Sequence, residues 1–273
     1  SRHHWYSPEL SSQLNERLRL EQSLRKAVEC DELDLVYQPK YASRTGRMCG
    51  AEALARWQHP ELGLVMPASF VGLAEHTGLI VLVGEQVIRR AVMHMASWQD
   101  AGLPALSVAI NVSPEQLRRT DVASYLAQQL DAYHVAASQI DIEITESAMV
   151  EQSDAVQTQL AQLRALGVRL VIDDFGAGYS SLSQLQRLDA DVLKMDRALV
   201  ARLVDGSDAE ALCRGIVWMA SALGLKVVAE GVETAEQLRI LRRIGCDELQ
   251  GYLLSMPVTA TELAQLLREG EQA

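Results

Sequence analysis

Several short apolar segments of the sequence each carry polar side chains, mostly in the second half of the segment. These side chains are Glu52, Asn111, Glu143, Asp173, Asp174, Lys194, Glu230 and Gln250. Burying a carboxylate without a partner is energetically costly. Because the acids lie inside apolar segments, we expect them to be paired with cations or to bind metal ions.

The acids and Asn111 form a ligand set made only of oxygen atoms, which suits Mg2+ or Mn2+ better than zinc. Asp173 and Asp174 are adjacent, and such a pair could bridge two metal ions ~3.5–4 Å apart. Two-metal sites of this kind hold the attacking and leaving oxygens of a phosphoryl displacement. Lys194 is the cation among these groups and could hold or activate the attacking water.

Arg56 shares a strand face with Glu52, because residues two apart in a strand point to the same side. The spacing puts Arg56 roughly 13 Å along the strand from Glu52. We therefore expect Arg56 at the mouth of the site, where its planar guanidinium could bind a phosphate.

The apolar segments alternate with stretches of helical periodicity, which predicts parallel strands joined by helices. Eight strands in ~220 residues favour an α/β fold, a closed TIM-like (β/α)8 barrel. In such a barrel the C-terminal strand ends meet at one face and would collect the polar side chains there. The connection from Ala42 to Arg47 is too short for a helix, so we expect the first strand to be antiparallel. The expected strands span residues 33–41, 50–57, 106–113, 140–146, 168–175, 191–196, 226–233 and 248–254.

The composition excludes several function classes. The 273 residues include 36 acidic and 25 basic side chains, and the net charge of −11 argues against binding to polymeric nucleic acid. The 4 cysteines form no CxxC pair, which argues against structural zinc. No apolar run approaches ~18 residues, so no membrane contact is expected of this domain. The start lacks a signal-peptide core, and we expect a cytoplasmic domain whose longer parent could be anchored in the inner membrane.

A family resemblance is carried by motifs that follow one another in register between Leu33 and Pro257. They are Glu52-Ala53-Leu54, NVS (111–113), EITE (143–146), DDFGAGYSSL (173–182), LKMD (193–196), AEGVET (229–234) and QGY (250–252). The chain resembles the EAL-domain phosphodiesterases of bacterial signalling. The resemblance implies hydrolysis of cyclic di-GMP to linear 5′-pGpG with two Mg2+ or Mn2+ ions, which lowers the level of this second messenger.

The resemblance also implies roles for individual residues. The first metal ion would be bound by Glu52, Asn111, Glu143 and Asp173, and the second by Asp173 and Asp174. The other members of the catalytic group would be Lys194 at the catalytic water, Glu230 supporting the metal site, and Gln250 at the water or substrate. The expected substrate contacts are Arg56 at a phosphate, Asp196 at a guanine, and Gln38.

The loop 174–182 contains Gly176, Gly178 and Tyr179 and follows directly from the paired aspartates. By resemblance, this loop contributes to a homodimer interface that couples association to activity. Glu146 is expected to anchor the loop, and Glu233 to pair with a neighbour near the site.

The predicted domain organisation has two parts. Residues 1–29 are expected to form a leading helix, a linker from upstream GGDEF or sensor domains. Residues 30–273 are expected to form the phosphodiesterase barrel.

Two alternative functions remain open. One is a cyclic di-GMP receptor module that binds without hydrolysis and signals by dimerisation. The other is an enolase-like barrel that abstracts a proton beside a carboxylate, although such a site would not need the adjacent Asp173 and Asp174. Metal dependence of turnover separates the enzyme from the receptor.

Overall fold

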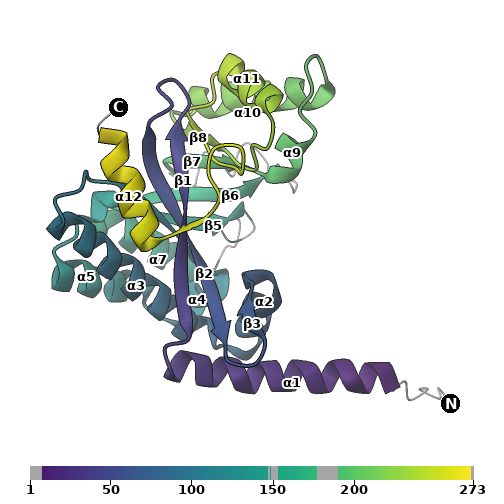
Figure 1. Ribbon diagram of the computed structural model, residues 1–273, viewed down its shortest axis with the longest axis vertical. Coiled ribbons are helices and arrows are strands. Elements are labelled where there is room, and N and C mark those ends of the chain that lie inside the picture. The colour runs from purple at the N-terminus through teal and green to yellow at the C-terminus, as the bar shows by residue number, and fades with distance from the viewer. Residues whose placement is uncertain (1–7, 147, 149–152, 177–189, 272–273) are drawn as a thin grey trace.

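A closed barrel of eight strands forms the centre of the molecule (Figure 1). The computed structural model describes residues 8–146, 148, 153–176 and 190–271. Around the ring, the strands are β1 (Leu33–Ala42), β9 (Glu248–Leu249), β8 (Lys226–Ala229), β7 (Val192–Met195), β6 (Arg169–Phe175), β5 (Ile140–Thr145), β4 (Ser107–Asn111) and β2 (Met48–His59). Pairing of β1 with β2 closes the ring. The expected (β/α)8 barrel is confirmed.

Strand β1 runs antiparallel to both of its neighbours, β2 and β9, while the other neighbouring strands of the ring are parallel. A tight turn joins β1 to β2, in which the Gly46 N–H donates to the carbonyl of Ala42 at 2.8 Å. This confirms the expected antiparallel first strand. The reversal also puts the N-terminal end of β1 beside the C-terminal ends of the other strands.

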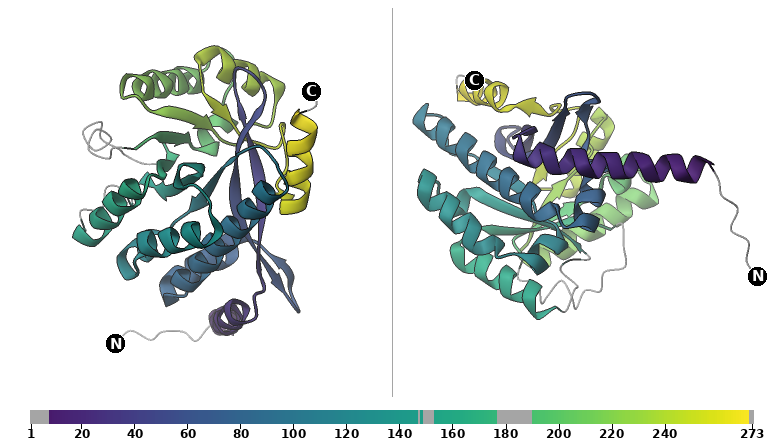
Figure 2. Two further views of the ribbon diagram at one scale, coloured as in Figure 1. Left: turned by 90° about the vertical axis from the view of Figure 1, so that its left-hand side faces the viewer. Right: turned by 90° about the horizontal axis from the view of Figure 1, so that it is seen from below.

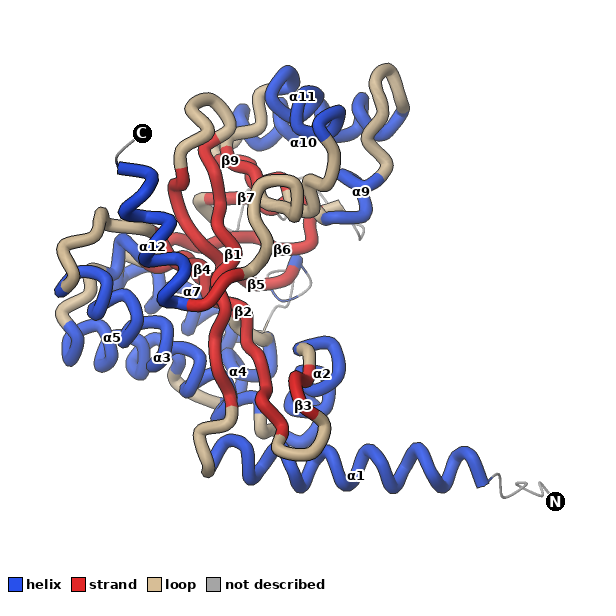
Figure 3. The backbone as a smooth tube through the Cα atoms, viewed as in Figure 1, coloured by secondary structure: helices blue, strands red, loops and turns tan. Residues whose placement is uncertain are grey.

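Helices surround the barrel, as Figure 2 and the blue segments of Figure 3 show. The helices that join successive strands are α3 (Ile80–Asp100), α5 (Val122–Tyr133), α7 (Asp154–Leu166), α10 (Asp208–Ala222) and α11 (Ala235–Ile244). The helices α7 and α11 end at Gly167 and Gly245, which adopt the left-handed conformation that favours glycine at a helix end. Among the described helices, none is long and apolar enough to cross a membrane.

Several elements lie outside this regular alternation. The long helix α1 (Pro8–Glu29) leads into the barrel and contacts α2 (Pro67–Thr77). Strands β3 (Gly63–Val65) and β10 (Val258–Thr259) extend the sheet beside β2 and β1. The remaining short helices are α4 (Pro114–Arg119), η1 (Ala137–Gln139) and α9 (Arg197–Ala201), and α12 (Ala260–Glu271) ends the described chain.

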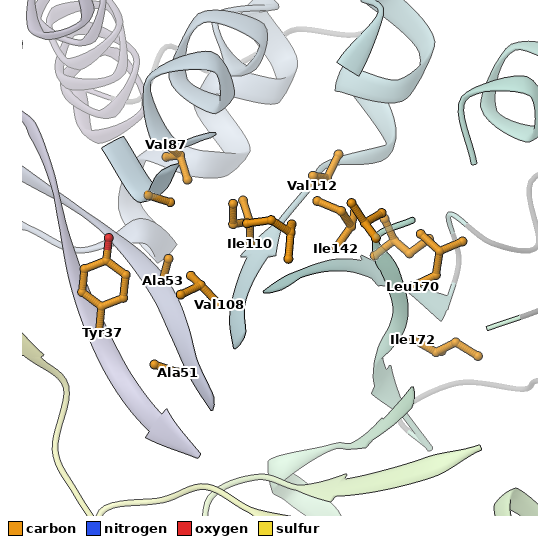
Figure 4. Packing of buried hydrophobic residues seen from close by; sticks show 14 of the residues in the cluster. Tyr37, Ala51, Ala53, Val87, Val108, Ile110, Val112, Ile142, Leu170 and Ile172 are labelled. Atoms are coloured by element: carbon orange, nitrogen blue, oxygen red, sulfur yellow. The ribbon is translucent and has the colours of Figure 1, made fainter. Parts of the chain in front are cut away.

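The two faces of each barrel strand carry different kinds of buried side chain. The outer face carries apolar residues such as Ile142, Leu170 and Ile172, which belong to the main core between barrel and helices (Figure 4). The alternating residues point inward, because successive side chains of a strand face opposite sides. Inside the barrel, Val171, Val192 and Val228 form a small apolar cluster of their own.

The strands β8 and β9 end well before the ends expected from the apolar pattern, residues 233 and 254. Strand β8 ends at Ala229 and β9 at Leu249, so Glu230 and Gln250 lie just after their strands. Glycines at φ +68° and +159° follow, namely Gly231 and Gly251. Such backbone conformations leave the extended geometry, which explains why the strands stop there.

Lys40 is buried at the opposite end of the barrel interior from the C-terminal strand ends, with 2% of its surface exposed. Its Nζ lies 3.2 Å from Oδ2 of Asp141. Arg169 donates from Nε and Nη2 to the two oxygens of the same carboxylate, at 2.7 and 3.0 Å. Gly50 makes room for this lysine, since a Cβ there would lie 3.0 Å from Lys40 Cε.

We expect Asp141→Ala to lower the free energy of unfolding by about 3 kcal/mol or more, because it leaves the buried Lys40 ammonium without its carboxylate. The matched control is Asp34→Ala in the same sheet. Asp34 is exposed and pairs with Arg90 at 3.6 Å, so its loss should cost less than about 1 kcal/mol. Urea denaturation of both variants measures the difference, and equal losses would contradict this account of Lys40.

Candidate functional site

Lys194 lies at the centre of a buried cluster of carboxylates inside the barrel. Its Nζ is 2.6 Å from Oε2 of Glu143 and 2.6 Å from Oε1 of Glu230. It is 3.2 Å from Oδ1 of Asp173 and 3.4 Å from Oε2 of Glu52. Only 1% of the lysine side chain is exposed, so these contacts are made away from bulk water.

Strand register explains why residues distant in sequence meet at this lysine. Asn111 lies opposite Glu143 across β4 and β5, and Gln38 lies opposite Glu52 across β1 and β2. The inward face of each strand therefore delivers its polar residue at a similar height in the barrel. This height is near the C-terminal ends of the parallel strands, where sequence analysis expected the site.

A β-bulge brings Asp174 to the same site as Asp173. Val171 and Ile172 pair with consecutive residues of β7, but the next pairing joins Phe175 to Met195, so Asp173 and Asp174 together face Lys194 alone. Asp174 has φ +56°, a left-handed conformation that aspartate tolerates better than most residues. Without the bulge, neighbouring strand residues would point to opposite faces.

Three acids offer oxygens that can share one cation. Carboxylate oxygens of Asp173, Asp174 and Glu230 all lie within 4.8 Å of one another. In addition, the buried Oε1 of Glu143 has no hydrogen-bond partner among the described residues. A set of carboxylate oxygens with unused acceptor capacity suits a hard divalent cation. The donor set therefore fits a metal ion.

Amide side chains orient the Glu52 carboxylate. Asn111 Nδ2 donates to Oε1 of Glu52 at 2.8 Å, and Gln250 Nε2 donates to Oε2 at 2.8 Å. Gln250 Nε2 also lies 3.1 Å from Oε1 of Gln38. Two amide donors fix both oxygens of Glu52, so its orientation is set before any ligand binds.

The charges in the cluster shift one another's ionisation. Burial alone would raise the pKa of Glu52, but Lys194 and side-chain hydrogen bonds with Gln250, Asn111 and Glu143 hold it at about 2. Burial and the nearby Glu52 charge raise the pKa of Glu143 well above its usual value. Burial and neighbouring acids raise the pKa of Glu230 to about 7 against the attraction of Lys194. Burial opposes the charged lysine, yet the carboxylates raise the pKa of Lys194, which is therefore an ammonium at neutral pH.

A cavity of about 220 Å3 opens beside Lys194 and is also lined by Gln38 and Gln250. An adjoining, mostly apolar cavity of about 520 Å3 lies between α2, α3, the middle of β2 and the C-terminal end of β4. Leu54 lines both cavities, so the two are neighbours across one side chain.

Some expected site residues lie elsewhere or in other contacts. Arg56 is buried and its Nη1 donates to the Ala55 carbonyl at 2.8 Å, so it does not line the smaller cavity. Asp196 accepts from the Ala198 N–H at 2.8 Å and caps α9. Glu146 has one buried carboxylate oxygen, Oε2, without a partner among the described residues.

The loop expected to couple dimerisation to activity is described only at its start. Gly176 adopts φ +100°, and a Cβ there would lie 2.4 Å from Leu199 Cδ1. Gly178 and Tyr179 lie outside the described residues. Glu233 Oε1 lies 2.7 Å from Arg197 Nη2.

Sequence analysis did not single out two residues that line the smaller cavity, Arg197 and Tyr252. Arg197 directly follows the LKMD motif, and Tyr252 ends the QGY motif. These positions are the signal in the sequence that could have indicated them.

Comparisons with known proteins identify similar chains. The family model described as "EAL domain" matches residues 21–257. The chain is 42% identical over 259 residues to the bifunctional diguanylate cyclase/cyclic di-GMP phosphodiesterase MucR of Pseudomonas aeruginosa. The aligned region covers 95% of this chain and 38% of MucR. The chain is 41% identical over 255 residues to the cyclic di-GMP phosphodiesterase PdeR of Escherichia coli, covering 93% of the chain and 38% of that protein. The chain thus spans well under half the length of these curated relatives.

Solved structures share the fold. The MucR phosphodiesterase in its cyclic di-GMP complex aligns with a TM-score of 0.85 at 43% identity, covering 90% of this chain and 99% of that one. The EAL enzyme Bd1971, bound to cAMP and cyclic di-GMP, aligns with a TM-score of 0.87 at 29% identity, covering 93% and 70%.

The raised pKa of Glu230 predicts a pH dependence of stability in metal-free protein. A carboxyl group whose pKa rises from 4.5 to about 7 on folding stabilises the protein below pH 4.5 and loses this contribution as the pH rises through 7. We expect Glu230→Gln to flatten the stability–pH curve between these values by on the order of 1 kcal/mol per pH unit.

Urea denaturation in chelator at several pH values measures this slope. Glu236→Gln, which alters an exposed carboxylate on α11, is the matched control and should leave the curve unchanged. Parallel curves for wild type and Glu230→Gln would show that Glu230 does not titrate in this window.

Proposed function

Because the chain belongs to the EAL-domain family, we propose that it hydrolyses cyclic di-GMP to linear 5′-pGpG. The observation that carries the proposal is the convergence of Glu52, Glu143, Asp173 and Glu230 on Lys194 beside a cavity. The names of the similar phosphodiesterases support the choice of substrate. The adjoining apolar cavity would give an extended dinucleotide an apolar wall beside the polar centre.

The proposed cofactors are two Mg2+ or Mn2+ ions. The first would be held by Glu52, Asn111, Glu143 and Asp173, and the second by Asp173 and Asp174, with Glu230 in support. When bound, these ions would neutralise the phosphate charge and lower the pKa of a water molecule. Cyclic di-GMP carries two negative phosphates, which the acidic cluster alone would repel.

Lys194 would orient the attacking water as a hydrogen-bond donor, because its raised pKa keeps it an ammonium. The water oxygen would attack phosphorus and the P–O bond to one ribose 3′ oxygen would break, with the water losing one proton and the leaving 3′ oxygen gaining one. The product keeps the second phosphodiester. Gln250, whose Nε2 already bonds Glu52 and Gln38, is placed to hold water or substrate nearby.

The remaining substrate contacts require rearrangement of side chains. Arg56 is the proposed phosphate contact, and it would exchange its bond to the Ala55 carbonyl for the phosphate. Asp196 is the proposed guanine contact and Gln38 a polar contact beside the ligand.

We expect Lys194→Ala to lower the turnover of cyclic di-GMP at least ~100-fold, the scale for a lost water-positioning group. Binding of Mn2+ should persist, because removing the ammonium frees the carboxylates for the metal ion. Chromatographic detection of pGpG, with Mg2+ and with excess chelator, measures turnover, and a thermal shift with Mn2+ measures metal binding. Lys226→Ala, an exposed lysine at the start of β8, is the control.

The outcomes separate the alternatives. Metal-dependent pGpG formation that Lys194→Ala abolishes supports the enzyme. Tight binding of cyclic di-GMP without product in Mg2+ or Mn2+ supports a receptor module instead. Turnover in excess chelator would contradict a metal-dependent reaction.

We also propose a homodimer that uses the loop 174–182, with Glu146 and the glycines of the loop coupling association to activity. The support is the direct connection of this loop to Asp174. Specific activity should rise with protein concentration across the dimer dissociation constant measured by analytical ultracentrifugation. Constant specific activity on both sides of that constant would contradict the coupling.

We also propose that the barrel is one domain of a longer parent protein. Residues 1–29 would link the barrel to upstream GGDEF or sensor domains of a parent protein. The barrel itself would work in the cytoplasm.

A further inference from the structure

Three side chains that the proposed reaction does not use stand together at the rim of the smaller cavity. Arg197 follows β7, Glu233 follows β8 and Tyr252 follows β9. Arg197 Nη2 lies 2.7 Å from Oε1 of Glu233, and Arg197 Cζ lies 6.0 Å from the centre of the Tyr252 ring. All three line the same cavity as Lys194.

The backbone holds these three residues in place although their side chains are exposed. A Cβ at Gly231 would lie 2.3 Å from Arg197 Cγ, so the arginine side chain packs directly on this glycine. A Cβ at Gly251 would lie 2.2 Å from the Val232 nitrogen. Val232 in turn donates to the Gln250 carbonyl at 3.0 Å and accepts from the Leu253 N–H at 3.0 Å. The segments that carry Glu233 and Tyr252 are therefore fixed to each other.

An exposed guanidinium above a tyrosine ring at the edge of a cavity offers two flat groups to a ligand ring. Arginine guanidinium planes and tyrosine rings are the groups on which proteins stack nucleobases. A base between two such planes needs about 7 Å, because each stacking contact is ~3.5 Å. Arg197 Cζ lies 6.0 Å from the centre of the Tyr252 ring, so the exposed guanidinium would have to move outward to admit a base between them. Glu233 restrains the guanidinium at the edge of the cavity and keeps it from the acidic centre.

We propose that Arg197 and Tyr252 clamp one guanine base of the substrate, and that Glu233 is the positioning residue for Arg197. This inference rests on the proposed function, since it assigns a base of cyclic di-GMP to the rim of the same site. The clamp selects ligands with a purine at this position, while the acidic centre recognises only the phosphodiester.

The test compares KM and kcat for cyclic di-GMP with kcat/KM for methyl 4-nitrophenyl phosphate, which has no purine. Loss of one stacked base costs ~10-fold or more in affinity. We therefore expect Arg197→Leu and Tyr252→Leu each to raise KM for cyclic di-GMP about 10-fold with kcat nearly constant. The loss on methyl 4-nitrophenyl phosphate should stay below about twofold.

Matched variants separate stacking from other effects. Tyr252→Phe, which keeps the ring, should recover most of the affinity lost in Tyr252→Leu. Glu233→Gln should raise KM less than Arg197→Leu does, because the arginine remains. Arg239→Leu removes an exposed arginine of α11 that pairs with Asp205 at 3.4 Å away from the cavity, and it should have no effect.

The inference and the proposed function fail in different ways. Equal losses on both substrates, or an unchanged KM for cyclic di-GMP, would overturn the clamp even if wild-type protein hydrolyses cyclic di-GMP. If wild-type protein binds cyclic di-GMP without hydrolysing it, the same variants are compared by calorimetric Kd, and a tenfold loss still supports the clamp. Absence of both binding and hydrolysis in wild type would overturn both proposals.

Discussion

Four carboxylates inside one barrel repel one another, and Lys194 is the group that lets them lie together without a metal ion. Its ammonium lies within 3.4 Å of each of them. The pKa values divide accordingly: Glu52 is held at about 2 while Glu230 rises to about 7. At the opposite end of the barrel interior, Lys40 and Arg169 neutralise Asp141 in the same way. Both ends of the interior depend on a buried cation, and the valine cluster fills the space between.

Much of the barrel could be predicted from the sequence, because each inward-pointing polar residue has apolar neighbours in the sequence, and these apolar runs mark the strands. The apolar runs locate β4, β5 and β6 to within one or two residues of their observed bounds. The short connection between Ala42 and Arg47 predicts the reversed first strand. The residues that meet at Lys194 were predictable because parallel strands end at one face, so Glu52 and Glu230 need no sequence proximity to meet.

Other features could not be predicted because they depend on contacts between distant segments. The lengths of β8 and β9 are set by Gly231 and Gly251, whose backbone angles become clear only when Arg197 and Val232 are seen against them. Strand spacing predicts that Arg56 contacts a phosphate, yet its guanidinium donates a hydrogen bond to the Ala55 carbonyl. The burial of Lys40 requires Asp141 from another strand and the missing side chain of Gly50, and neither is evident from the residues around Lys40.

The bulge in β6 shows where a strand of this barrel can hold one additional residue. In a regular strand such as β5, inserting or deleting one residue would exchange the two faces, turning Glu143 toward the helices and Ile142 toward the acidic site. Such a change would destroy site and core at once. At Asp173 and Asp174 the strand already holds one residue more than its partner, and the left-handed backbone of Asp174 absorbs it. The second aspartate thus occupies the extra position of the bulge, where an added residue keeps both faces of the strand in place and also joins the acidic site.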